Sequence, residues 1–159
     1  MKVTNILLMM LSLCSTALAQ SDNQPETQPA PSALSVQPET QNGVTYLCGG
    51  VGSDESAYMK RAAKDYDLMS TFAAQNGSYL ADVDVDISDR SGKSILQTTC
   101  SGPILLVKFP RAGSYRIRAE TSGHAQTKTA QVRAKRGTRS VVFVWPASQA
   151  GVETPSPRK

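Results

Sequence analysis

The chain has 159 residues, with 17 Lys and Arg against 13 Asp and Glu, a single histidine and three cysteines. This length suits one domain, and so few histidines and cysteines leave little for catalysis or metal binding. With 40% apolar and 19% charged residues the chain has the composition of a globular protein. The apolar residues suited to a core lie between Val44 and Ala147, which predicts one small sandwich or barrel.

The first 19 residues have the pattern of a secretory signal peptide. A positive start and an apolar run precede Ala17-Leu18-Ala19, the small-x-small pattern that a signal peptidase reads before Gln20. We therefore predict cleavage between Ala19 and Gln20, a periplasmic or secreted mature protein, and no transmembrane segment after signal removal. The alternative is a lipoprotein anchored through Cys14, although Leu13 stands where a lipobox has a small residue.

Two polar segments flank the apolar part of the chain. Residues 20–43 are rich in Pro, Gln, Glu and Thr, and the pentapeptide Gln-Pro-Glu-Thr-Gln occurs at 24–28 and again at 37–41. Such a segment buries too little surface to offset its ordering entropy, so it is predicted to be a disordered linker, either a tether or a spacer. Residues 148–159 are predicted to be a second disordered end.

The segment 44–67 predicts a strand followed by a helix. Val44–Cys48 is β-branched and aromatic, and Gly49–Gly52 ends it. Ser53 is placed to cap a helix in which Tyr58, Ala62 and Tyr66 recur at a spacing of four. We expect this pair of elements to be an N-terminal extension of the domain.

From Leu68 onward the apolar residues recur at every second position, and turn residues interrupt them at short intervals. Many short strands with frequent turns are typical of an antiparallel β-sandwich, so a mainly β fold is predicted. Strands are expected at 68–73, 80–87, 94–100, 104–109, 115–120, 127–134 and 140–145. The predicted core residues are Val83, Val85, Ile87, Leu105, Val107, Tyr115, Ile117, Phe143 and Trp145.

Several motifs of this region resemble the carboxypeptidase regulatory-like domain. They are the run at 76–85, Ser91-Gly92-Lys93, the Pro-x-x-Gly-x-Tyr motif within 109–117, and Ser122-Gly123-His124. The resemblance implies a transthyretin-like or Ig-like sandwich over 68–147 and a non-catalytic module of exported proteins. This chain departs from the family at Arg111, where a second proline is more frequent, and Val44 to Asp65 falls outside the resemblance.

The residues offer weak candidates for catalysis or cofactor binding. His124 is the only imidazole and lies in a Gly-adjacent turn, so a surface role is favoured over a general base in a small hydrolase. Gly49–Gly52 precedes a helix, but Asp54 and Glu55 at its start would repel a phosphate. We therefore expect no enzyme activity and no cofactor.

Metal binding is also disfavoured. Asp82, Asp84, Asp86 and Asp89 suggest a calcium loop, but alternate carboxylates on a strand are spread apart, and Lys93 stands where a bidentate Glu belongs. A solvated strand face is the preferred interpretation. Two mature cysteines and one histidine do not supply four zinc ligands.

The mature cysteines, Cys48 and Cys100, are an even pair in an oxidising compartment. This favours a structural disulfide that joins the extension to the sandwich, with two buried free thiols as the alternative. A redox-active pair is not expected, because the chain has no Cys-x-x-Cys motif.

Charge divides along the chain. Ser21 to Pro103 carries 11 acidic and 5 basic residues, whereas Lys108 to Arg139 carries 9 basic and 1 acidic. The basic residues singled out as a candidate binding site are Arg116, Arg118, Lys135, Arg136 and Arg139.

Two interpretations of these residues remain open. Asp82, Asp84 and Asp86 can pair with the arginines across neighbouring strands. Alternatively, the last hairpin presents an electropositive patch to an envelope glycan, lipid headgroups or an acidic protein, nucleic acid being rare in that compartment. The expected function is a non-catalytic exported module that binds a protein or an anionic envelope polymer, or else a structural accessory subunit of an envelope complex.

Overall fold

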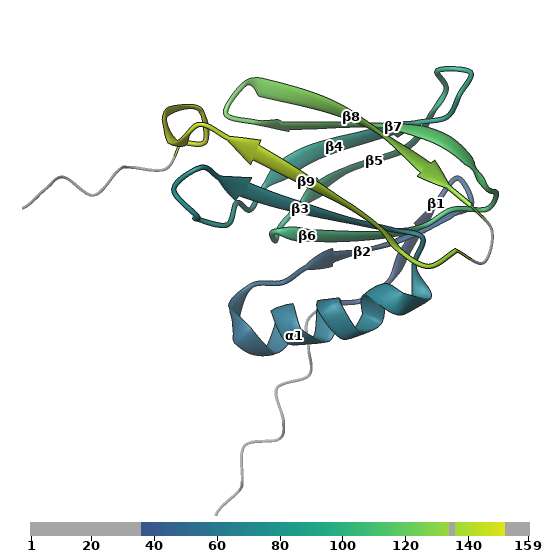
Figure 1. Ribbon diagram of the computed structural model, residues 1–159, viewed down its shortest axis with the longest axis horizontal. Coiled ribbons are helices and arrows are strands. Elements are labelled where there is room, and N and C mark those ends of the chain that lie inside the picture. Colours follow the sequence, from purple (N-terminus) through teal and green to yellow (C-terminus); the bar gives the residue numbers. More distant parts are fainter. Residues whose placement is uncertain (1–35, 134–135, 152–159) are drawn as a thin grey trace, which may run out of the picture. The chain divides into compact units, whose positions relative to one another are not determined.

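The computed structural model describes residues 36–133 and 136–151, which form two facing β-sheets and one α-helix (Figure 1). Sheet A has five strands in the order β1-β2-β6-β3-β9, and sheet B has four in the order β5-β4-β7-β8. The predicted mainly β sandwich is therefore confirmed. The strands are β1 (Glu39–Gln41), β2 (Val44–Gly49), β3 (Leu68–Ala74), β4 (Val83–Ser88), β5 (Ser94–Cys100), β6 (Ile104–Lys108), β7 (Gly113–Thr121), β8 (His124–Val132) and β9 (Arg139–Trp145), and the helix is α1 (Gly52–Ala62).

The core lies between the two sheets and follows from the alternation of apolar and polar residues. In β4, Val83, Val85 and Ile87 point inward while Asp84 is exposed. All of the predicted core residues are buried. The Trp145 indole is fully buried and donates its N–H to the backbone oxygen of His124 at 2.9 Å, which satisfies its polar group.

A second, smaller cluster joins α1 to the outer face of sheet A. Met59 of the helix is fully buried and packs with Leu47 and Leu106, which point away from the space between the sheets. β2 lies between β1 and β6, so residues 44–67 supply an internal strand and a helical cover of the sandwich instead of an appendage. The covered outer face explains why β2 and β6 read as nearly continuous apolar runs.

The start of α1 differs from the prediction that Ser53 caps it. The N-cap residue is Val51, which makes no side-chain cap hydrogen bond. Instead Glu55 Oε1 accepts the N–H of Gly50 at 2.7 Å, so a carboxylate from the first turn fixes the entry to the helix. The neighbouring glycines serve close packing, because a Cβ on Gly102 would lie 2.4 Å from the carbonyl carbon of Gly49.

Both segments predicted to be disordered include residues that belong to elements of the fold. Glu39–Gln41, part of the second pentapeptide copy, forms β1 because Asn42 (φ 50°) and Gly43 (φ 78°) make a tight turn back into β2. At the other end, Ala147–Gln149 forms a 3₁₀ turn, and Ala150 is 8% exposed. The first pentapeptide copy lies outside the described residues.

Two strand predictions also change. β4 begins at Val83 and not at Leu80, because Asp82 has a left-handed backbone (φ 53°) that breaks the extended run. β9 pairs with β3 in parallel, an exception to the expected antiparallel pattern. This happens because the chain leaves β8 of sheet B and enters sheet A at the end where β3 begins.

Both sides of the sandwich are closed by cross-sheet links. On one side the disulfide between Cys48 and Cys100, with a Cα–Cα distance of 5.6 Å, joins β2 to β5. Nearby, Gln41 Oε1 accepts the N–H of Gln97 at 2.7 Å. The predicted disulfide is therefore present.

The opposite side is closed by polar side chains of β8. Gln126 Nε2 donates to the backbone oxygen of Val144 at 2.8 Å, and Lys128 Nζ donates to that of Val142 at 2.7 Å. Val142 and Val144 belong to β9, the edge strand of sheet A. These links cover carbonyl groups that an edge strand otherwise offers to another chain.

Candidate functional site

One end of the sandwich gathers basic residues from separate loops. β4, β6 and β8 finish at this end, and β5, β7 and β9 start there, because β4–β5, β4–β7 and β7–β8 are antiparallel pairs. The end is seen in Figure 1 where β8 finishes and β9 begins. We call it the basic end, and its exposed cations are Arg90, Lys93, Lys108, Arg111, Arg133, Arg136 and Arg139.

The opposite end carries no Lys or Arg in its loops at 75–82, 101–103 and 122–123 or in residues 146–151. The loops at the two ends of the fold thus differ in the number of cations that they carry. Such a difference creates an electrostatic field that attracts anions to one end.

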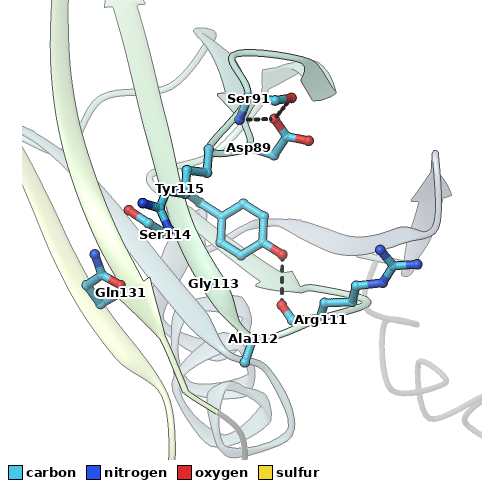
Figure 2. A pocket seen from close by; sticks show the side chains of 9 residues that line it. Asp89, Ser91, Arg111, Ala112, Gly113, Ser114, Tyr115 and Gln131 are labelled. Carbon is cyan, nitrogen blue, oxygen red and sulfur yellow. Dashed lines mark hydrogen bonds between the residues drawn. The ribbon is translucent and has the colours of Figure 1, made fainter.

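The first hollow of the basic end lies beside Tyr115, and we call it the Tyr115 hollow. It measures about 830 Å³ and is lined by residues of the β4–β5 loop, the β6–β7 loop and the start of β7. Gln131 of β8 lies on the side opposite Arg111 (Figure 2). The Tyr115 hydroxyl donates to the backbone oxygen of Arg111 at 2.7 Å. Its ring stacks on Phe109 with centroids 3.9 Å apart. These two contacts hold the loop that carries Arg111.

Tyr115 itself serves as a structural anchor. It is 6% exposed, and burial raises the pKa of its hydroxyl above the usual value. The hydroxyl therefore stays protonated and keeps donating to Arg111. The Pro-x-x-Gly-x-Tyr motif acts here as a tyrosine corner, in which an inward tyrosine fixes the chain a few residues upstream.

Asp89, the acidic residue of the Tyr115 hollow, is occupied by its own turn. Its Oδ1 accepts the N–H of Ser91 at 2.8 Å (Figure 2) and that of Lys93 at 3.1 Å. The hydrogen bond from the Ser91 hydroxyl is the main cause that lowers the pKa of Asp89. The Asp89 carboxylate is thus hydrogen-bonded by donors of its own turn.

The second hollow lies between β8 and β9, and we call it the Arg139 hollow. It measures about 340 Å³, and its lining includes Arg133, Arg136, Arg139, Asp67 and Gln131. Asp67 Oδ2 accepts the N–H of Phe109 at 2.8 Å, so this carboxylate is also hydrogen-bonded within the fold. Gln131 lines both hollows, so the two adjoin.

The residues predicted from sequence are divided among several places. Arg136 and Arg139 lie at the Arg139 hollow, whereas Lys135 lies outside the described residues. Arg116 is exposed on the outer face of sheet B, two positions beyond Ser114 of the Tyr115 hollow. Arg118 forms an ion pair with Glu120 and does not belong to the basic end.

The expected ladder of Asp and Arg pairs is not formed among the described residues. Asp86 is the register partner of Arg118, but Asp84 lies opposite Glu120. Asp84 Oδ1 instead accepts from Thr99 Oγ1 at 2.6 Å, and Asp86 Oδ2 accepts from Gln97 Nε2 at 2.7 Å. Both aspartates are therefore hydrogen-bonded to side chains of β5.

Sequence reasoning missed Arg90, Arg111 and Arg133. Each follows or precedes a strand in a different loop, so no local cluster marks them. The available signal was the succession of hairpins, because alternate loops of an antiparallel chain return to the same end.

Catalytic and metal chemistry gain no support from this geometry. His124 is exposed at the start of β8, and within residues 36–133 and 136–151 no hydrogen bond joins its ring to a serine or a carboxylate. Over the same residues no group of three or more His, Cys, Asp or Glu is placed to hold a metal ion. The predicted cleavage between Ala19 and Gln20 and the alternative lipid site at Cys14 lie outside the described residues.

The fold and its basic end define a mainly β sandwich with a cationic surface. No protein-family model matches the chain, and no curated protein is significantly similar to it. The residues of the basic end are therefore the basis for inferring a function. In the part of the chain that the structure describes, no helix is long and apolar enough to cross a membrane.

Proposed function

We propose that this protein is a non-catalytic exported binding module whose basic end holds an anionic partner of the cell envelope. The observation that carries the proposal is the convergence of exposed arginines from three loops on two adjoining hollows. The carboxylates of these hollows, Asp67 and Asp89, are held by hydrogen bonds within the fold. The five arginines that line the hollows outnumber these two carboxylates, so the basic end offers a ligand an excess of guanidinium groups.

Two further features support export and the lack of catalysis. The signal-peptide pattern before Gln20 agrees with the Cys48–Cys100 disulfide, because such bonds persist in oxidising compartments. The resemblance to the carboxypeptidase regulatory-like domain supports a module without catalytic residues. An accessory role in a larger envelope complex is compatible with the same surface if the anionic partner is a protein.

The test removes positive charge from the basic end and measures the loss of affinity for anionic probes. A control variant changes the net charge by the same amount at the opposite end. The variant Arg136→Gln/Arg139→Gln is compared with Gln75→Glu/Ser101→Glu, which changes the net charge equally at the opposite end. All four positions are exposed, so both variants should fold. The probes are a carboxylated polysaccharide, poly-glutamate and phosphatidylglycerol vesicles, measured at low and moderate salt.

We expect the arginine variant to lose at least about tenfold in affinity for the anionic probe that the native protein binds, and the control to lose less than about twofold. Binding should also weaken as salt rises, because exposed charges are screened. Equal binding by both variants at low ionic strength, where the attraction is strongest, would contradict the proposal.

A separate variant addresses the small-hydrolase alternative. His124→Ala should leave both anion binding and thermal stability unchanged, because the His124 ring is exposed and only its backbone oxygen holds Trp145. If the variant abolished a cellular phenotype while the melting temperature stayed the same, the binding-module proposal would be wrong.

A further inference from the structure

We infer that the partner at the basic end is an acidic polysaccharide chain that lies across both hollows, with acidic groups at the arginines and uncharged sugar units between them. The inference rests on the proposed function and adds the chemical class of the ligand and its path. It follows from the adjacency of the two hollows, the neutral side chains between their arginines, and the location of the exposed apolar residues.

The two hollows form one continuous path over the ends of β7 and β8. Ser114 and Gln131 are register partners on these strands, and both line the Tyr115 hollow. Gln131 also lines the Arg139 hollow. A ligand can therefore run from Arg111 past Ser114 and Gln131 to Arg133 without leaving the surface.

This path has two groups of arginines with neutral side chains between them, which suits a sugar polymer. Arg90 and Arg111 border the Tyr115 hollow, and the arginines at 133, 136 and 139 border the other. Guanidinium groups bind carboxylate, sulfate and phosphate through paired hydrogen bonds. Between them, Ser114 and Gln131 offer neutral donors and acceptors, which match hydroxyl groups. A poly-glutamate chain would offer these middle groups no hydroxyl partners.

The exposed apolar residues argue against a membrane surface as the partner. Among the described residues the large exposed apolar side chains are Val51, Tyr79, Val142 and Val144. None of them belongs to the loops of the basic end. Segments that dock on membranes insert apolar side chains below the headgroups, and the basic end has none to insert.

A folded acidic protein is also a poor fit for this surface. Stable protein interfaces bury aromatic or aliphatic anchors at their centre, surrounded by a polar rim. The only aromatic residue lining the two hollows, Tyr115, is 6% exposed and is engaged with Phe109 and Arg111. A slender flexible chain can enter the hollows without such an anchor.

Hydrogen bonds hold the described parts of the three loops before any ligand binds. The Thr138 hydroxyl shares its hydrogen between the backbone oxygens of Ala63 and Tyr66, at 2.6 and 2.9 Å, which anchors the residue before β9. The Tyr115 and Asp89 hydrogen bonds hold the other two loops. These described parts need little ordering on binding, which favours affinity for a flexible polymer.

The test measures hyaluronan oligosaccharides of increasing length, in which a glucuronate alternates with a neutral sugar unit, by calorimetry at low salt, with neutral oligosaccharides of equal length as blanks. We expect affinity to rise with length and then reach a plateau when both hollows are filled. Arg111→Gln and Arg136→Gln, one in each hollow, should each weaken the longest oligomer about tenfold. The matched control Arg118→Gln removes the same charge from an arginine that is paired with Glu120 and lies elsewhere, and it should change affinity less than about twofold.

Several results would overturn the inference while leaving the proposed function intact. One is that Arg136→Gln weakens the affinity for the longest oligosaccharide while Arg111→Gln does not. The others are that a poly-glutamate peptide of the same length binds as tightly as the oligosaccharide, or that phosphatidylglycerol vesicles bind more tightly. If none of these probes binds at low salt, both the inference and the proposed function are wrong. Unchanged melting temperatures of the exposed arginine variants show that any loss comes from binding.

Discussion

The Cys48–Cys100 disulfide allows the largest stability effect to be worked out from the structure. The two cysteines are 52 positions apart in the sequence. For a closed loop of this length the chain-entropy relation gives a stabilisation of about 4 kcal/mol, because the unfolded chain loses conformational freedom. We therefore expect Cys48→Ala/Cys100→Ala to lower the free energy of unfolding by about 4 kcal/mol.

The remaining contacts on this side of the sandwich cannot replace the bond. Gln41 accepts the N–H of Gln97, and Asn42 Nδ2 donates to the backbone oxygen of Ile95 at 3.2 Å. Each hydrogen bond contributes only about 1 kcal/mol net, and both are exposed. They also do not restrict the unfolded chain, so they leave the loop-closure term unchanged.

Urea denaturation measures the effect directly. With a denaturant slope of about 2 kcal/mol per molar, a loss of 4 kcal/mol lowers the unfolding midpoint by about 2 M. Reductant should shift the native protein similarly and leave the double variant unaffected. A midpoint shift below about 0.5 M, or thiol labelling of denatured protein that has not been reduced, would show that the bond does not stabilise the fold in this way.

Three further predictions follow from individual contacts. Val85 is 3% exposed on the inner face of β4, so Val85→Asp should cost at least about 3 kcal/mol by burying an unpaired charge. The exposed neighbour change Asp84→Asn should cost about 0.5 kcal/mol, and equal urea midpoints for the two variants would contradict the alternation. The pKa of Asp89 is lowered in the fold, so its carboxylate adds to the free energy of unfolding above the ordinary carboxyl pKa of about 3.9. This contribution is lost as the pH falls through the lowered pKa. The melting temperatures of the native protein and Asp89→Ala should therefore differ at pH 7 and converge in strong acid, and a gap that persists in acid would refute this. Lys128→Ala uncovers a carbonyl of the β9 edge, so sedimentation should show concentration-dependent association that is absent from the outer-face control Thr127→Ala.

The amino-acid sequence by itself determined which residues build the core and which face water. Alternation is a local property of a strand, so Val83, Val85 and Ile87 could be assigned to the core without knowing their neighbours. The disulfide could be predicted because only two of the three cysteines follow the predicted cleavage site. The capping prediction at Ser53 failed because the side chain that engages the backbone at this helix start is Glu55, a contact that sequence position does not reveal.

Only the tertiary structure decided which residues form the basic end. The three-residue strand β1 is polar and gains its order from pairing with β2, so its composition alone predicted a linker. β9 joins β3 in parallel in the opposite sheet from β8, and this crossing brings Arg139 and Arg133 to the edges of one hollow. Apolar periodicity specifies the face of each strand, but the order of strands and the meeting of loops depend on how the two sheets pack. For that reason the sequence shows that residue 111 is an arginine, but only the fold shows that Arg111 lies near the other arginines of the basic end.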